Sequence, residues 1–141
     1  MQANKFFLLA DDDHDDAELF SEALSTVGPS IKFHHVEDGQ EVFQFLSTSK
    51  IEKPDVIFLD LNMPAMSGWQ CLAKLKNDTA LKNIPVIMYS TSSNPREKEI
   101  AIELGATGFV TKPTEFKVLT KILETISDNL DSDLKRILKE M

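Results

Sequence analysis

The sequence predicts an α/β fold, a doubly wound five-stranded parallel sheet with helices on both faces. Short apolar runs alternate five times with segments of helical periodicity, and regular β-α alternation is typical of a parallel sheet with right-handed crossovers. The chain has 141 residues, of which 42% are hydrophobic. This length and composition suit one domain with a buried core rather than a disordered chain.

The five apolar runs are the predicted strands. They occupy residues 6–10, 31–36, 56–59, 86–89 and 108–111. The first run is continuous and apolar, as expected of a strand buried on both faces of a parallel sheet. No internal repeat or long linker interrupts the series, so we expect all five strands in one sheet.

The segments after the strands are the predicted helices. The first helix follows an acidic stretch, residues 11–16, and ends at Gly28 and Pro29. The predicted N-cap residues of the later helices are Asp38, Ser67, Asn94 and Thr114. Glu41 and Glu97 each follow an N-cap by three residues, which indicates capping boxes at those two helices.

Residues 1–127 form the predicted main domain, and residues 128–141 a short C-terminal helical extension. One face of that extension would carry Leu130, Leu134, Ile137 and Met141. An otherwise polar helix of this length is only marginally stable by itself. It is therefore either a continuation of the last helix, packed on its own domain, or a segment for docking or for forming a homodimer.

Composition narrows the class of partner. The formal net charge of -8 argues against nucleic-acid binding, because phosphate contacts need a basic surface. A single cysteine, Cys71, excludes an internal disulfide and favours a reducing compartment. The apolar run near the start is too short for a signal peptide or a membrane span. We expect a cytoplasmic protein without nucleic-acid or membrane partners.

Polar and charged side chains follow four of the predicted strands directly. They are Asp11, Asp12 and Asp13 after the first strand, Asp60 after the third, Ser90 after the fourth and Lys112 after the fifth. In an open parallel sheet, ligands bind outside the carboxyl ends of the strands. Clustered carboxylates are costly unless cations neutralise them, and Mg²⁺ takes oxygen ligands. The sequence therefore predicts a magnesium site of Asp12 and Asp60, with Asp11 acting directly or through water.

The same arrangement favours phosphoryl transfer. Asp60 would be the nucleophile that becomes an acyl phosphate, while Lys112 and the Ser90 hydroxyl would bind phosphoryl oxygens. Taken alone, residues 11–13 are also typical of helix capping and dipole compensation. The histidines at positions 34 and 35 have no ligand spacing, so we interpret them as core or edge residues.

These residues resemble a known family. The Asp11-Asp12 pair, the segment Asp60-Leu-Asn-Met-Pro-Ala-Met-Ser-Gly68, Ser90 and Lys112-Pro113 resemble the receiver domain of two-component response regulators. The resemblance runs from about residue 6 to residue 126. It implies a flavodoxin-like strand order of 2-1-3-4-5.

The resemblance also implies roles for single residues. Asp60 would be the phosphoacceptor, and Mg²⁺ would be held by Asp11, Asp12, Asp60 and the backbone carbonyl of Asn62. Lys112 and Ser90 would bind the phosphoryl group, and Ser90 and Phe109 would form the conformational switch. A cis peptide would join Lys112 to Pro113.

The implied partner is a sensor histidine kinase or a histidine phosphotransfer protein, which would donate the phosphoryl group. The chain would be a stand-alone switch that catalyses only its own phosphorylation and dephosphorylation, rather than a turnover enzyme. The residues after the main domain are too few for a DNA-binding or catalytic module. We expect output through altered binding of an unknown protein target at the face formed by the fourth helix, fifth strand and fifth helix.

Two other interpretations stay open. Asp11 and Asp13 after a first strand also resemble the nucleophile and acid of haloacid-dehalogenase-type phosphatases, which would make Asp11 the phosphorylated residue. That interpretation leaves Asp60 and the segment after it unexplained. Alternatively, the chain is a receiver-like interaction module that takes no phosphoryl group.

Overall fold

The computed structural model describes residues 5–48, 52–130 and 133–140, and it confirms the predicted fold class. Five strands form one parallel sheet in the order β2-β1-β3-β4-β5. The strands are β1 (Phe6–Ala10), β2 (Lys32–Val36), β3 (Val56–Leu59), β4 (Val86–Ser90) and β5 (Gly108–Thr111). The helices are α1 (His14–Val27), α2 (Gly39–Leu46), α3 (Gly68–Lys76), α4 (Pro95–Glu103), α5 (Phe116–Asp128) and α6 (Leu134–Glu140).

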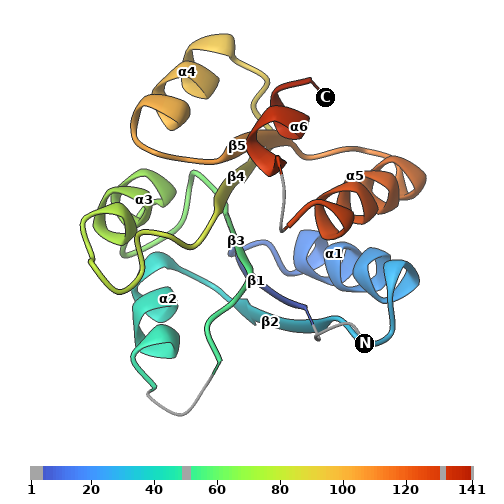
Figure 1. Ribbon diagram of the computed structural model, residues 1–141, viewed down its shortest axis with the longest axis horizontal. Coiled ribbons are helices and arrows are strands. Elements are labelled where there is room, and N and C mark those ends of the chain that lie inside the picture. Colours follow the sequence, from blue (N-terminus) through green and yellow to red (C-terminus); the bar gives the residue numbers. More distant parts are fainter. Residues whose placement is uncertain (1–4, 49–51, 131–132, 141) are drawn as a thin grey trace.

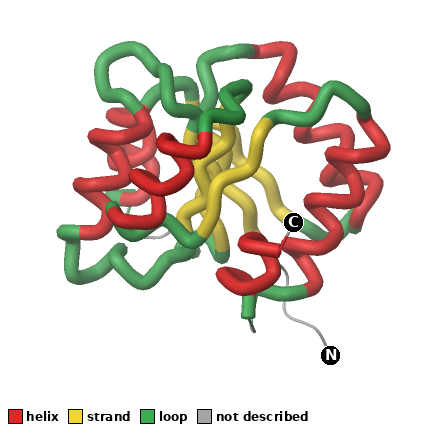
Figure 2. The backbone as a smooth tube through the Cα atoms, turned by 90° about the horizontal axis from the view of Figure 1, so that it is seen from above, coloured by secondary structure: helices red, strands yellow, loops and turns green. Residues whose placement is uncertain are grey.

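Helices cover both faces of the sheet. Helices α1 and α5 lie on one face, and α2, α3 and α4 lie on the other (Figure 1). The central strands β1, β3 and β4 are buried along their whole length, which explains their continuous apolar sequences. Seen from above, the sheet forms the middle layer between the two helical layers (Figure 2).

Local side-chain bonds define several helix starts, as the sequence predicts. The side chains of Asp38 and Ser67 accept hydrogen bonds from backbone N–H groups at the starts of α2 and α3. Three predicted details are wrong. Glu41 accepts from the Glu37 N–H, so it does not close a box with Asp38. Glu97 accepts from the Ser92 hydroxyl instead of closing a box with Asn94, whose side chain caps Arg96. The N-cap of α5 is Glu115 instead of Thr114, because the backbone is still extended at Glu115 and the helix begins only after it. The Glu115 side chain makes no capping hydrogen bond.

The C-terminal extension is a separate helix rather than a continuation of α5. Helix α6 folds back and packs beside β5, the edge strand of the sheet (Figure 1). Its Leu134 and Leu138 are buried in the core on the α1 and α5 side, whereas Ile137 is only half-buried. The predicted face is thus only partly right. Leu134 packs on the domain as predicted, but Leu138 is buried instead of Ile137, Leu130 precedes the helix, and Met141 lies outside the described residues.

Gly108 explains how α6 can lie so close to β5. A Cβ atom at this position would be 2.6 Å from Leu138 Cδ1, so only glycine leaves room for that leucine. Within the described residues, no helix combines the length and apolar composition that crossing a membrane requires.

Candidate functional site

Parallel pairing brings two acidic loops together at the carboxyl end of the sheet. Strand β1 pairs with β3 so that Ala10 lies beside Leu59. Asp11 and Asp60, the next residue of each strand, therefore leave the sheet side by side. The N–H of Asp60 donates to the Ala10 carbonyl over 3.0 Å, which extends the pairing by one residue. The predicted meeting of the first and third strand ends is confirmed.

The other side of the site comes from β4 and β5. These strands pair Ser90 with Thr111, and the N–H of Lys112 donates to the Ser90 carbonyl over 2.6 Å. Ser90 is buried, and its hydroxyl accepts a hydrogen bond of 3.2 Å from the Ser92 N–H. The register of β4 and β5 therefore places the Ser90 hydroxyl and the Lys112 side chain at neighbouring strand ends.

Three carboxylates converge at this end of the sheet. Asp11, Asp12 and Asp60 each offer an oxygen atom, and these atoms lie within 4.8 Å of one another. Asp12 is exposed, Asp60 is 8% exposed and Asp11 is fully buried. Oδ1 of Asp11 accepts from the Asp13 N–H over 2.9 Å, and its Oδ2 faces the Lys112 ammonium over 2.8 Å. Three carboxylates whose oxygens converge in this way fit a hard divalent cation such as Mg²⁺.

Lys112 is the cation that faces this cluster. Its Nζ lies 2.8 Å from Asp11 Oδ2 and 3.4 Å from Asp60 Oδ2, and its side chain is only 8% exposed. Burial lowers the pKa of this ammonium, but the hydrogen bonds to Asp11 and Asp16 and the charges of Asp11 and Asp60 outweigh burial. The net effect raises the pKa of Lys112 above its ordinary value, so it is fully charged at neutral pH.

Asp16 is a member of this cluster that the sequence analysis missed. Its Oδ2 lies 2.8 Å from Lys112 Nζ, and its side chain is 32% exposed. Asp16 belongs to the acidic stretch of residues 11–16, in which only residues 11–13 were given roles, and it lies in the first turn of α1. The sequence offered no signal that separates Asp16 from the neighbouring acids, because only the folded chain shows which of them reaches Lys112.

The electrostatics of the cluster are unbalanced without a metal ion. Burial, opposed by Lys112 and the Asp13 N–H, raises the pKa of Asp11 from 3.8 to about 6, and the Asp60 charge adds to the increase. Asp11, Asp16 and Asp60 lie around the one ammonium of Lys112, and the carboxylate of Asp12 lies near those of Asp11 and Asp60. Ionising Asp11 therefore costs free energy that a bound divalent cation would offset.

The glycine in the Asp60–Gly68 segment has a steric role. A Cβ atom at Gly68 would lie 2.1 Å from the Asp60 carbonyl oxygen, and the Gly68 N–H donates to the Leu61 carbonyl over 2.9 Å. The start of α3 thus packs directly against the backbone of the candidate nucleophile. Any larger residue at position 68 would displace the loop that carries Asp60.

Three predicted site residues lie around this centre. Asn62 follows Asp60 in the loop, and its N–H points to Asp60 Oδ1 over 3.4 Å. Phe109 lies on β5, half-buried against the core on the α2 to α4 side. The predicted cis peptide before Pro113 is wrong, since no described peptide bond is cis. Lys112 reaches all three carboxylates from a trans bond, which is the default isomer.

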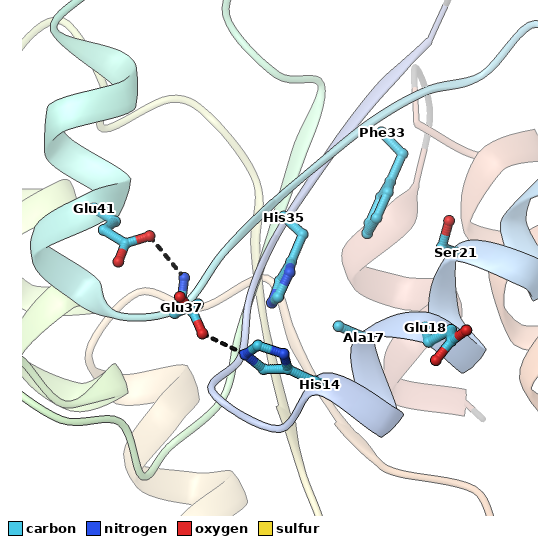
Figure 3. A pocket seen from close by; sticks show the side chains of 8 residues that line it. All are labelled: His14, Ala17, Glu18, Ser21, Phe33, His35, Glu37 and Glu41. Carbon is cyan, nitrogen blue, oxygen red and sulfur yellow. Dashed lines mark hydrogen bonds and ion pairs between the residues drawn. The ribbon is translucent and has the colours of Figure 1, made fainter.

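Apart from this site, an open pocket of about 500 Å³ lies beside β2 (Figure 3). His14 forms an ion pair with Glu37 there, and a ring nitrogen of His35 lies 2.7 Å from the Asp11 carbonyl oxygen. His34 stacks on Phe45 with ring centroids 4.1 Å apart. His34 and His35 both lie on β2, which is an edge strand of the sheet, as their interpretation as edge residues predicts.

Comparison with known proteins agrees with this geometry. The family model of the response regulator receiver domain matches residues 7–124. The response regulator Rcp1 of Synechocystis sp. is 32% identical over 126 residues, which cover 86% of each chain. The crystal structure of Mn²⁺-bound Rcp1 superposes with a TM-score of 0.77, covering 88% of this chain and 92% of that one, at 31% identity. The phosphorylated cyanobacterial phytochrome response regulator RcpA gives 0.81 at 32% identity, covering 89% of this chain and 93% of that one.

Proposed function

The chain belongs to the response regulator receiver domain family, and we propose that Asp60 is its phosphoacceptor in two-component signalling. The observation that carries this proposal is the convergence on one point of Asp60, the Lys112 ammonium and the oxygens of Asp11 and Asp12. Phosphoryl transfer needs positioned groups and neutralised charge, and this arrangement supplies both.

Asp60 is a better nucleophile candidate than Asp11. Both oxygens of Asp11 face charged or polar partners at 2.8 to 2.9 Å, and its side chain is fully buried. Asp60 keeps some exposure, and its two polar contacts are longer, at 3.4 Å each. An incoming donor can therefore reach Asp60. This difference argues against the phosphatase alternative in which Asp11 is phosphorylated.

In the proposed reaction, a carboxylate oxygen of Asp60 attacks the phosphorus of a phosphohistidine on a sensor kinase or phosphotransfer protein. The new O–P bond forms as the P–N bond breaks. The histidine ring of the donor, which carries a proton on its other nitrogen, leaves as neutral imidazole with the electron pair of that bond. Lys112 and the Ser90 hydroxyl bind phosphoryl oxygens. Mg²⁺ held by Asp11, Asp12, Asp60 and the Asn62 carbonyl would neutralise charge on the phosphoryl group. Two relatives support this proposal, since the structure of Rcp1 is of its Mn²⁺-bound form and that of RcpA is of the phosphorylated protein.

The proposed output is altered binding of a separate protein. Ser90 would move toward the phosphoryl group, and Phe109 would turn inward to fill the space that Ser90 leaves. Phe109 lines a groove of about 280 Å³ between α4, β5 and α6, together with Ile102 and Lys135. Its movement would reshape that groove, so the face expected to carry output includes α6 as well. A cytoplasmic location and a homodimer stay predictions.

Intact-mass spectrometry tests the proposal. Purified protein is incubated with acetyl phosphate and Mg²⁺, with EDTA in a parallel sample. We expect a labile mass increase of one phosphoryl group that requires Mg²⁺ and disappears in Asp60→Asn. Asp15→Asn is the matched control, because it removes the same charge at an exposed position nearby and should be phosphorylated normally. A mass increase that survives Asp60→Asn but is lost in Asp11→Asn would favour the phosphatase alternative, and no increase at all would favour the inactive module.

A further inference from the structure

Among the described residues, the Lys112 ammonium has one carboxylate partner outside the predicted metal and phosphoryl-binding residues, besides the face of the Tyr89 ring. This partner is Asp16, which accepts a hydrogen bond from Lys112 Nζ over 2.8 Å. The backbone N–H of Asp16 donates to the side chain of the N-cap residue Asp13 over 3.0 Å. Capping therefore fixes the first turn of α1, from which the Asp16 carboxylate reaches the loop after β5.

The three carboxylates around Lys112 differ in what a broken contact would cost. Asp11 is fully buried, so losing the ammonium would leave a desolvated charge without a cation. Asp60 is the proposed phosphoacceptor. The side chain of Asp16 is 32% exposed, so water can solvate its carboxylate once the ammonium leaves. Asp16 is the partner that Lys112 can exchange at least cost.

We propose that Asp16 is a positioning residue that competes with the phosphoryl group on Asp60 for the Lys112 ammonium; this inference rests on the proposed function of Asp60. An ammonium has three N–H donors, and three carboxylates already surround this one. A phosphoryl group brings up to about two negative charges and three acceptor oxygens to Asp60. Lys112 then exchanges Asp16 for a phosphoryl oxygen, and the Asp16 carboxylate turns to water.

The consequence is a bias built into the unphosphorylated state. The contact between Asp16 and Lys112 stabilises that state and is absent once Lys112 binds the phosphoryl group. A ligand or modification shifts a two-state balance only by its difference in interaction with the two states. Removing the Asp16 charge should therefore favour the phosphorylated state, although Asp16 touches neither the metal nor the phosphoryl group.

Beryllofluoride, a stable mimic of the phosphoryl group on aspartate, gives an equilibrium test. Its dissociation constant is measured by isothermal titration calorimetry at saturating Mg²⁺ for wild type, Asp16→Asn and Asp16→Ser. We expect binding about 3- to 10-fold tighter in both variants, the range that a partly exposed ion pair supplies. Asp16→Glu, which keeps the charge, should stay closer to wild type. Asp15→Asn is the matched control and should match wild type, because Asp15 has the same charge but no contact with Lys112.

Each outcome decides between the two proposals. If wild type binds and the Asp16 variants bind equally or more weakly, the competition is refuted while the proposed function stands. An equal gain in Asp15→Asn would assign the effect to general charge and would also refute it. If wild type does not bind beryllofluoride with Mg²⁺, the proposed function is refuted, and the inference about Asp16, which rests on it, is refuted as well. Thermal unfolding followed by circular dichroism confirms that the variants compared are folded.

Discussion

Replacing Asp11 by asparagine should stabilise the metal-free protein at neutral pH. The Asp11 side chain is fully buried, and its pKa is raised from 3.8 to about 6, chiefly by that burial. Asparagine keeps the shape of the side chain and can still accept the Asp13 N–H, but it carries no charge. The substitution therefore removes the group whose ionisation costs the folded state free energy.

The magnitude follows from the two pKa values. At about 1.4 kcal/mol for each pH unit, the difference between 3.8 and about 6 corresponds to about 3 kcal/mol. The folded-state pKa of Asp11 lies above its unfolded value, so the stability that its protonated form contributes is fully present below pH 3.8. It is lost as the pH rises through about 6. We expect Asp11→Asn to raise the midpoint of thermal unfolding by about 10 °C above that pH.

The assay is urea and thermal unfolding in EDTA, at several pH values between about 3.5 and 7.5. The advantage of Asp11→Asn should shrink toward zero at the acid end. Saturating Mg²⁺ at neutral pH should also reduce the stability difference between Asp11→Asn and wild type, because ligand binding stabilises the wild-type fold. Asp15→Asn, which removes an exposed charge in the first turn of α1, should change stability little. Equal or lower stability of Asp11→Asn in EDTA at pH 7.5 would refute this reasoning.

Three further substitutions test other contacts. Gly68→Ala should lower the free energy of unfolding, measured in urea, by more than about 2 kcal/mol, because the new methyl group meets the backbone of Asp60. Gly28→Ala is the control and should cost less, because its methyl group would meet only a side chain. Lys112→Ala should remain folded by circular dichroism but lose most of its mass increase with acetyl phosphate, whereas exposed Lys117→Ala should keep it. Leu138→Ala should cost about 2 kcal/mol and speed hydrogen exchange across α6, more than Ile137→Ala does. Unchanged unfolding in Gly68→Ala, normal phosphorylation in Lys112→Ala, or slow exchange of α6 in Leu138→Ala would each contradict the role given to that residue.

Local sequence signals were enough to predict the elements and the place of the site. Continuous apolar runs gave the buried strands, and side chains such as Ser67 could be identified as helix caps because the bond they make spans only three residues. Once the strands are parallel, their carboxyl ends share one edge. That geometry is why Asp11, Asp60 and Lys112 could be placed together from positions far apart in the chain.

Contacts between elements were beyond the sequence. The Asp16 to Lys112 hydrogen bond joins residues 96 positions apart, and nothing in the acidic stretch distinguishes Asp16 from its neighbours. The return of α6 onto β5 depends on the space above Gly108, a property of the assembled sheet. The trans bond before Pro113 is a choice between two isomers of similar energy.

The sequence by itself thus determined a five-stranded α/β domain with acids, a hydroxyl and an ammonium at one edge, because the periodicity and order of residues fix strands, helices and their ends. Only the tertiary structure decided which carboxylates share the single ammonium of Lys112 and how deeply each is buried. Those properties depend on packing between helices and strands, which sets the distances and the solvation that determine charge energies.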